Sequence, residues 1–365
     1  MQCKPINVLF LIPSLRGGGA ERVIVTLLKH LDRSRFRLSL AVIDVRGAVF
    51  RDDIPSDVEF IDLGVTRVRH ALPKIVALIW NRRPDVVFST LGHLNLALSI
   101  IRFLLPREVR TIARETSIVS ATLQTYAHPG VWAMLYRRFY PRHDLVVCQS
   151  RYMNADLIER FGFSSERSVV INNPVDIDHI RRLASSPLDH AGSMPGRLRL
   201  VAAGRLSEVK GFDLLIEALG LLNNPNVHLC ILGEGLLLNE LKQLAVSNGV
   251  ANQIDFVGFQ ANPYAWFARA DAFVLSSRHE GFPNVVLEAL ACGTPVIATP
   301  APGGTREILD SFVDCVVAES VSAQALATAI ASYLSGMRRR ISPSALMAYA
   351  PDRIVRQYEQ VLEGA

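Results

Sequence analysis

The stretch Glu280-Gly281-Phe282-Pro283-Asn284-Val285-Val286-Leu287-Glu288, continuing as Ala-Leu-Ala-Cys-Gly-Thr-Pro-Val-Ile-Ala, decides the fold class. The apolar runs before it (272–275) and after it (295–298) each predict a buried strand. Pro283 is typical of the first turn of a helix and Gly293 of its end, so the order is strand, loop, helix, strand. The loop at 276–284 is therefore expected at the carboxyl end of a parallel sheet, where open α/β folds bind ligands.

Two carboxylates frame this stretch. Glu280 is expected in the loop and Glu288 about one turn into the helix, so both can approach one ligand from different heights. The hydroxyls of a sugar and of a ribose are suitable partners for such a pair, and the N–H groups at the helix start suit a phosphate. The alternative is that both glutamates are solvated charges near a helix N-terminus, where the helix dipole favours them.

The same residues resemble the signature of glycosyltransferase family 4. The resemblance lies in two glutamates separated by seven residues, with G-F-P-N between them and E-A-L-A-C-G-T-P-V-I-A at the end. Family members are retaining enzymes of the GT-B fold, in which two Rossmann-like doubly wound domains face each other across a cleft. The resemblance implies an α/β chain of that architecture.

The rest of the chain supports two domains. At 365 residues it is long enough for two, and predicted strands alternate with predicted helices, which indicates parallel sheets covered on both faces. Residues 183–196 are small, polar and rich in Pro and Gly, a linker composition. We predict an acceptor-binding domain at 1–185 and a nucleotide-sugar-binding domain at 186–345. By resemblance, a C-terminal helix within 346–365 packs back on the first domain.

A second motif opens the second domain. Arg205 and Lys210 lie five apart in a loop before a predicted helix, so they can converge on one diphosphate or remain solvated. R-x-x-x-x-K-G accompanies the glutamate pair in the family, which implies that both cations bind the donor phosphates. Glu280 is then implied to hold sugar hydroxyls and Glu288 the ribose. The implied donor-binding residues are Gly17, Gly18, Gly19, Gly204, Arg205, Lys210, Gly258, Phe259, Glu280, Gly281, Phe282, Asn284, Val285 and Glu288.

The first domain opens with a strand at 7–12 followed by Gly17-Gly18-Gly19 and a helical pattern. Glycines at this turn allow an anion to approach the backbone closely. The turn matches neither G-x-G-x-x-G nor a Walker loop, which argues against a dinucleotide oxidoreductase. G-G-G-A-E-R-V resembles the opening of relatives that build bacterial surface glycans, where this loop approaches the donor diphosphate.

Two polar loops of the first domain supply further candidates. Many relatives carry a histidine near the anomeric centre at the place where Arg114-Glu115 stands here. We expect Arg114 to act in catalysis, by stabilising the diphosphate or by binding an anionic acceptor. His93, Asn95 and Glu115 join it as predicted acceptor-binding residues. For His93, the alternative is a helix-start residue without a role.

Charge and cysteine content limit the partners. Residues 1–185 hold 26 Lys and Arg against 17 Asp and Glu, a net of +9, whereas residues 186–365 have a net of −4. The basic half predicts an anionic partner such as lipid headgroups or pyrophosphate, or reflects surface solubility alone. No nucleic-acid-binding motif accompanies this charge.

Five scattered cysteines indicate reduced thiols and no zinc site. No segment of about 20 apolar residues, the length needed to span a bilayer, is present. We expect a cytoplasmic protein, peripheral on the inner face of the membrane.

The predicted activity is transfer of a hexose or N-acetylhexosamine from a nucleoside-diphosphate sugar, UDP favoured, with retention and without a metal or other cofactor. The predicted acceptor is a polyprenyl-pyrophosphate-linked glycan in bacterial surface polysaccharide, lipopolysaccharide or O-antigen synthesis. The alternatives are a GDP-mannose-dependent mannosyltransferase, a GT-B epimerase acting on nucleotide sugars, and a catalytically silent binding protein.

Overall fold

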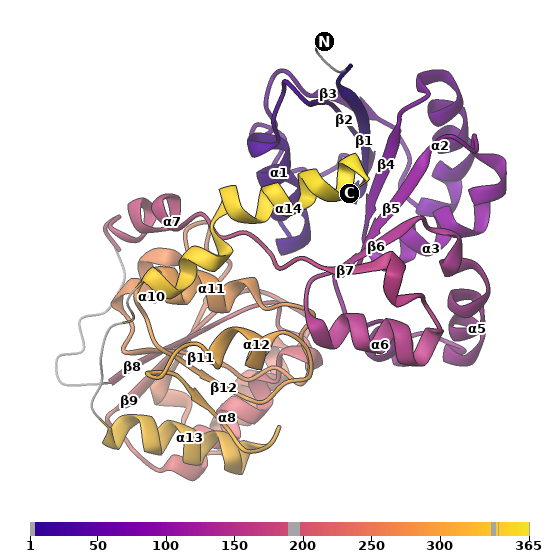
Figure 1. Ribbon diagram of the computed structural model, residues 1–365. Helices are drawn as coiled ribbons and strands as arrows, with labels where there is room; N and C mark the ends of the chain where they lie inside the picture. Colours follow the sequence, from indigo (N-terminus) through magenta and orange to yellow (C-terminus); the bar gives the residue numbers. More distant parts are fainter. Residues whose placement is uncertain (1–3, 189–197, 337–340, 342, 365) are drawn as a thin grey trace. The chain divides into compact units, whose positions relative to one another are not determined.

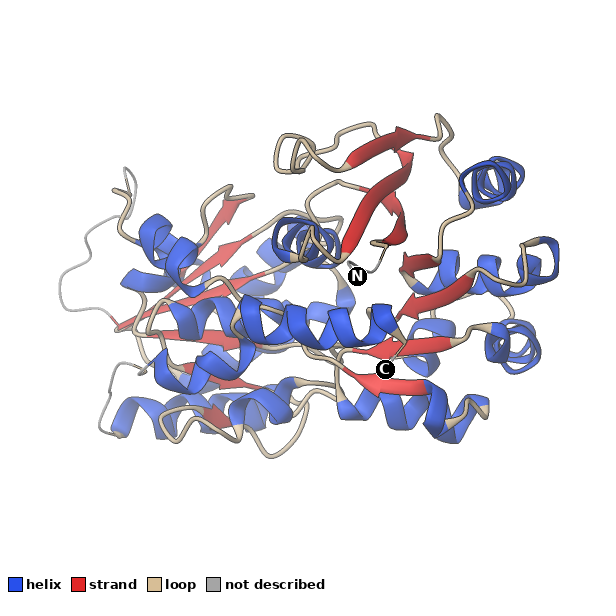
Figure 2. Ribbon diagram, turned by 45° about the horizontal axis from the view of Figure 1, so that its top comes forward, coloured by secondary structure: helices blue, strands red, loops and turns tan. Residues whose placement is uncertain are grey.

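The computed structural model describes residues 4–188, 198–336, 341 and 343–364. The chain divides into two compact units, residues 1–174 with 351–365 (unit 1) and residues 175–350 (unit 2). Each unit contains one parallel sheet with helices on both faces, as Figures 1 and 2 show. The predicted α/β class with two doubly wound domains is confirmed.

The sheet of unit 1 has seven parallel strands in the order β3-β2-β1-β4-β5-β6-β7. The order reverses between β1 and β4, which is the topological switch point of this sheet. The strands are β1 (Ile6–Ser14), β2 (Phe36–Asp44), β3 (Glu59–Asp62), β4 (Val86–Thr90), β5 (Arg110–Arg114), β6 (Leu145–Cys148) and β7 (Ser168–Val170).

Alternation along β1 explains how this sheet is covered. Val8, Phe10 and Ile12 face one core, while Leu9 and Leu11 face the other, as expected when successive side chains point to opposite faces. The first core packs against α1 and α14, and the second against α2 and α3. The helices of unit 1 are α1 (Gly19–His30), α2 (Val68–Arg82), α3 (Gly92–Ile101), α4 (Val119–Gln124), α5 (Pro129–Phe139), α6 (Arg151–Phe161) and α14 (Pro351–Glu363).

The sheet of unit 2 has six parallel strands in the order β10-β9-β8-β11-β12-β13, with its switch point between β8 and β11. Its strands are β8 (Leu198–Ala203), β9 (Val227–Leu232), β10 (Ile254–Gly258), β11 (Ala272–Leu275), β12 (Val296–Ala298) and β13 (Val316–Val317). Its helices are α7 (Ile177–Ala184), α8 (Phe212–Leu222), α9 (Leu238–Ser247), α10 (Tyr264–Arg269), α11 (Asn284–Ala291), α12 (Thr305–Leu309) and α13 (Ala323–Ser335).

The division between the units falls at Pro174, earlier in the chain than the predicted boundary at residues 185 and 186. The reason is that α7 packs against α10 and α11, and its Ile180 belongs to the core of unit 2. Most of the predicted linker at 183–196 lies outside the described residues.

The C-terminal helix belongs to unit 1. Ile354, Val355 and Tyr358 of α14 are buried in the core that also contains α1, whereas Leu346 and Tyr349 just before it pack in unit 2. The predicted return of the chain end to the first domain thus starts at Pro351 rather than at residue 346. Within the described part of the chain, no helix is both long and apolar enough to cross a membrane.

Candidate active site

Loops from neighbouring strands meet at the carboxyl edge of the unit 2 sheet. The loop after β8 contains Arg205 and Lys210, and the loop after β11 contains Glu280. Because β8 and β11 flank the switch point, these two loops lie at the position where open α/β sheets bind ligands. The structure therefore brings together the two motifs that were most informative in the sequence.

An ion pair joins the two loops. Lys210 Nζ donates to Glu280 Oε1 at 2.6 Å, and the Ser277 hydroxyl donates to the same oxygen at 2.6 Å. Glu280 is nine-tenths buried, so this carboxylate is held in one place by an ion pair and a hydrogen bond. Sequence analysis missed Ser277, although a polar pair, Ser276-Ser277, directly after a buried strand was a usable signal.

Arg205 differs from Lys210 in its surroundings. Its side chain is exposed, and among the described residues its guanidinium has no hydrogen-bond or ion-pair partner. A fork of N–H donors that nothing else occupies is well suited to a phosphate. Asn284 and Val285 form the start of α11 and Glu288 follows one turn later, all partly exposed, so they lie where the sequence predicted them.

The backbone around Glu280 is packed tightly against the next loop. Glu280 N donates to Pro302 O at 2.9 Å, and a Cβ placed on Gly303 would lie only 1.5 Å from the Glu280 carbonyl oxygen. Gly303 also has φ +119°, a conformation that favours glycine. A residue with a side chain at 303 would therefore displace the loop that holds Glu280.

A second ion pair, between Arg278 and Asp213, holds the loop after β11 in place. The Arg278 guanidinium donates to both carboxylate oxygens of Asp213 on α8, at 2.8 and 2.6 Å, and to Glu208 O at 2.8 Å. The hydrogen bond from Arg278 holds the pKa of Asp213 below its usual value. These bonds tie the loop after β11 to α8 through Asp213 and to the loop after β8 through Glu208, which helps to position Lys210 and Glu280 relative to each other.

Three further predicted donor residues have distinct surroundings. Phe282 is buried, with its ring 6.1 Å from that of Tyr349, so only its backbone is available to a ligand. Phe259, after β10, is about two-thirds exposed and can present its ring to a base. Gly258 O accepts from Gly233 N at 2.8 Å, which connects the ends of β9 and β10.

In unit 1 the glycine turn precedes α1, with Gly18 as the N-cap residue and Gly19 as the first residue of the helix. The Glu21 carboxylate folds back over it, because a Cβ placed on Gly18 would lie 2.2 Å from Glu21 Oε2. Ser14 Oγ donates to Glu21 Oε1 at 3.3 Å, and Glu21 is buried. This carboxylate at the helix N-terminus opposes the approach of an anion, although Gly17 to Gly19 were predicted to meet the diphosphate.

The expected role of Arg114 in contact with a substrate is not supported by its position. Arg114 is fully buried, and it donates to Tyr358 Oη at 3.0 Å, to Asn173 Oδ1 at 2.6 Å and to Thr90 Oγ1 at 3.4 Å. Its side chain turns into the sheet core because these partners satisfy a charge that burial would otherwise make costly. In this structure Arg114 attaches α14 to the first sheet.

Asn95 and Glu115 are likewise interior residues rather than exposed acceptor ligands. Asn95 Nδ2 donates to Glu115 Oε1 at 3.1 Å, and the Tyr140 hydroxyl donates to the same oxygen. Burial raises the pKa of Glu115 above its usual value. Of the four predicted acceptor residues, His93 alone is exposed.

The buried network predicts a pH effect on stability. His143 Nε2 is 2.9 Å from Asn95 O, and burial lowers the pKa of its ring from 6.5 to about 4. Because the unfolded chain binds this proton and the folded chain does not, stability falls as the pH drops from about 6.5 to about 4. The expected loss is about 3 kcal/mol for a shift of this size.

Urea unfolding at pH 7 and pH 4.5 measures this loss. His143→Gln, which keeps a donor toward Asn95 but cannot titrate, should lose less stability than the wild type over that interval. Equal pH dependence of the two proteins would exclude the assigned role of His143.

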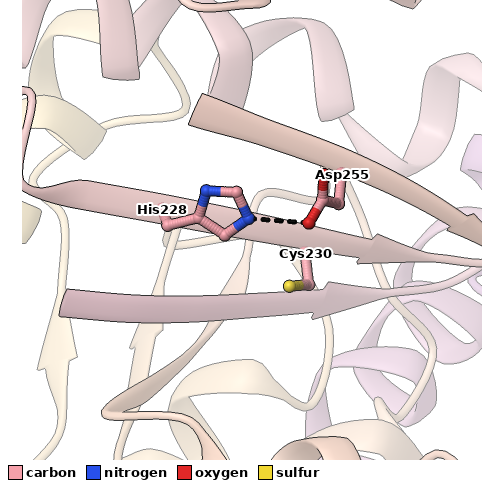
Figure 3. Close-up of side chains that lie close together, drawn as sticks. All are labelled: His228, Cys230 and Asp255. Carbon is pink, nitrogen blue, oxygen red and sulfur yellow. Dashed lines mark hydrogen bonds and ion pairs between the residues drawn. The ribbon is translucent and has the colours of Figure 1, made fainter. Parts of the chain in front are cut away.

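One group of side chains in unit 2 has the composition of a metal site. Figure 3 shows His228 and Cys230 on β9 beside Asp255 on β10, and their ligand atoms lie within 4.8 Å of one another. His228 Nε2 is 2.8 Å from Asp255 Oδ2, and burial raises the pKa of the Cys230 thiol to about 11. His228 and Asp255 are each second in their strands, at the edge opposite the Lys210–Glu280 loops. This group therefore has no part in the candidate active site.

Two family profiles match the chain. Residues 17–179 match Glycosyltransferase Family 4, and residues 192–346 match Glycosyl transferases group 1. The chain thus contains a Glycosyltransferase Family 4 domain followed by a Glycosyl transferases group 1 domain. The second match includes both loops that carry Arg205, Lys210 and Glu280, and the chain is accordingly a glycosyltransferase.

Relatives of the chain are likewise named as glycosyltransferases. The chain is 27% identical over 309 residues to the N-acetylgalactosamine-N,N'-diacetylbacillosaminyl-diphospho-undecaprenol 4-alpha-N-acetylgalactosaminyltransferase of Campylobacter jejuni, and the match covers 81% of each. It is 29% identical over 247 residues to an uncharacterized glycosyltransferase of Methanocaldococcus jannaschii, covering 65% of this chain and 60% of that one. It is 32% identical over 222 residues to the lipopolysaccharide core biosynthesis glycosyltransferase LpsE of Rhizobium meliloti, covering 56% and 63%.

Solved structures agree with the fold. Anabaena HepE, crystallised in complex with UDP, is 23% identical with a TM-score of 0.78, and the match covers 99% of this chain and all of that one. WaaG, a glycosyltransferase involved in lipopolysaccharide biosynthesis, is 18% identical with a TM-score of 0.72, covering 98% and 100%.

Proposed function

We propose that the chain transfers a hexose or N-acetylhexosamine from a nucleoside-diphosphate sugar, UDP favoured, to a lipid-linked saccharide, with retention of configuration. The observation that carries the proposal is the Lys210–Glu280 pair at the switch point of the unit 2 sheet, with the exposed Arg205 in the same loop as Lys210. Cations for a diphosphate and a fixed carboxylate for a sugar are the two functions that this chemistry requires.

In the proposed reaction an acceptor hydroxyl attacks the anomeric carbon on the face that the diphosphate leaves. The bond between that carbon and the phosphate oxygen breaks with its electron pair on the phosphate, which takes the acceptor proton. Arg205 and Lys210 stabilise the charge on the departing nucleoside diphosphate. Glu280 holds sugar hydroxyls and favours the developing positive charge, and Glu288 binds the ribose. The step as proposed needs no metal.

The proposed acceptor and location rest on relatives and on charge. The Campylobacter relative is named for a diphospho-undecaprenol acceptor, and LpsE for lipopolysaccharide core biosynthesis. Together with the net charge of +9 on residues 1–185, this supports work at the inner face of the cytoplasmic membrane of a bacterium. A mycobacterial relative named as GDP-mannose-dependent, 32% identical over 251 residues, keeps mannosyl transfer as the second candidate.

A donor panel tests the proposal. UDP-hexoses, UDP-N-acetylhexosamines and GDP-mannose are offered with extracted polyprenyl-diphosphate glycans, and release of nucleoside diphosphate is followed. We expect one UDP sugar to be consumed in the presence of the lipid acceptor, and Glu280→Ala to abolish its consumption. Consumption of GDP-mannose instead would select the second candidate. Turnover by Glu280→Ala at the wild-type rate would contradict the assigned role of Glu280.

A further inference from the structure

A cavity of about 370 Å³ opens at the carboxyl edge of the unit 1 sheet. It is lined by residues 66–69 together with Pro13, Ile43 and His93. These residues follow or end four neighbouring strands, β1 to β4, so the cavity lies at the topological switch point of the sheet. Its size is that of a small-ligand site, and none of the predicted acceptor residues except His93 reaches it.

The charges around this cavity have one sign. Arg67 and Arg69 both line it and both are exposed, and none of its lining residues is acidic. The Arg67 guanidinium has no hydrogen-bond or ion-pair partner among the described residues, whereas Arg69 Nε lies 3.2 Å from His70 Nε2. Asp44 follows the lining residue Ile43, but its carboxylate is bound by Arg16 at 2.5 Å and by Arg46 at 2.9 Å. The acid nearest in sequence is therefore compensated by two cations.

Helix ends strengthen the positive field. Val68 and Arg69 form the start of α2, whose first turn has no acidic residue, and His93 lies in the first turn of α3. Both helices direct the positive ends of their dipoles to the cavity. Desolvation lowers the pKa of His93 below its ordinary value, which favours the neutral form of the ring.

The backbone beside the cavity is strained. Leu91, which precedes α3, has φ +77°, an outlier for a residue with a bulky side chain. Such conformations persist where the surrounding structure holds a functional loop in place. Leu91 directly precedes α3, so this backbone conformation sets where α3 begins and therefore where His93 lies.

We infer that this cavity binds the phosphate or diphosphate group of the acceptor, through Arg67 and Arg69, with His93 contacting the adjoining saccharide. The inference rests on the proposed function and moves the acceptor site away from Arg114, Asn95 and Glu115. In this proposal, part of the excess positive charge of residues 1–185 binds a specific anionic ligand.

Arg67→Ala, Arg69→Ala and the double variant test this assignment. Neither arginine supports the fold, because Arg67 precedes α2 without a side-chain capping bond and both side chains are exposed. Arg107→Ala is the matched control, since it is an exposed arginine of the same unit just before β5, at the opposite edge of the sheet. Two soluble acceptors are compared, a short-prenyl diphosphate glycan and an alkyl glycoside of the same saccharide without phosphate.

We expect KM for the diphosphate acceptor to rise roughly tenfold for each single variant and about 100-fold for the double variant, as for loss of charged hydrogen bonds. KM for the phosphate-free acceptor and the Kd for the donor should change less than twofold, and Arg107→Ala should behave as wild type. An equal rise for both acceptors, or no rise, would overturn the inference while transfer by the wild type leaves the proposed function standing.

Two further measurements distinguish the acceptor diphosphate from lipid headgroups as the ligand of the two arginines. Inorganic pyrophosphate titrated calorimetrically into UDP-saturated protein should bind the wild type and not the double variant, a result that does not require turnover. Binding of the double variant to pyrophosphate at wild-type affinity would refute the site. If the double variant loses only its affinity for vesicles containing anionic phospholipid, the arginines serve lipid headgroups and the acceptor assignment is wrong.

Discussion

Lys210→Ala is expected to lower kcat by about 100- to 1000-fold, the usual effect of removing one group that stabilises transition-state charge. The change removes a cation from the proposed diphosphate site. It also leaves the nine-tenths buried carboxylate of Glu280 with the Ser277 hydroxyl but without its ion-pair partner. Both consequences act on the leaving group or on the sugar, so the loss should appear in kcat at saturating donor and acceptor.

The matched control is Lys242→Ala on α9, because this lysine also belongs to unit 2 but is exposed on a helix outside the two loops. It should retain wild-type kcat. Unfolding midpoints of both variants check that the fold is intact. A Lys210→Ala variant that is folded and keeps more than a third of the wild-type kcat would show that Lys210 does not neutralise the leaving diphosphate.

Gly303→Ala is expected to destabilise unit 2 by about 3 kcal/mol or more and to remove donor binding. The new Cβ would lie 1.5 Å from Glu280 O, and an L-residue is strained at φ +119°. Relief of the clash requires movement of the loop that carries Glu280, so stability and activity should fall together. Urea denaturation followed by circular dichroism measures the first, and UDP titration the second.

Gly249→Ala separates the effect of the steric clash from the effect of the strain at a positive φ. Gly249 also has a positive φ, of +70°, but a Cβ there would meet nothing within 4 Å. This variant should lose only about 1 kcal/mol and keep full UDP affinity. If the two variants lose the same stability, the tight packing of Gly303 on the Glu280 loop has no energetic consequence.

The sequence predicted most of the fold because buried parallel strands are continuous apolar runs. Residues 7–12 and 272–275 are two such runs, and each lies within a strand of the structure. The strand Val316–Val317 was not predicted, because two residues are too few for a pattern to indicate anything. The assignment of α7 to unit 2 depends on packing against α10 and α11, which composition around a linker does not reveal.

The candidate site was predictable where motifs place residues in loops at strand ends. Lys210 and Glu280 were found in this way, although the bond between them depends on two strands becoming neighbours across the switch point. Arg114 was misjudged because polarity at a strand end does not tell whether a side chain turns outward or into the core. Its partner Tyr358 lies 244 positions along the chain, on a helix whose docking only the fold shows.

Calorimetric titration of UDP into the wild type, Arg205→Ala and Lys242→Ala tests the central claim most directly. The Arg205 guanidinium is exposed and has no partner among the described residues, so its loss should leave the fold unchanged and affect the ligand alone. We predict that UDP binds the wild type and Lys242→Ala with the same Kd, and Arg205→Ala at least tenfold less tightly. Equal UDP affinity in all three proteins would contradict a diphosphate site at the switch point of unit 2.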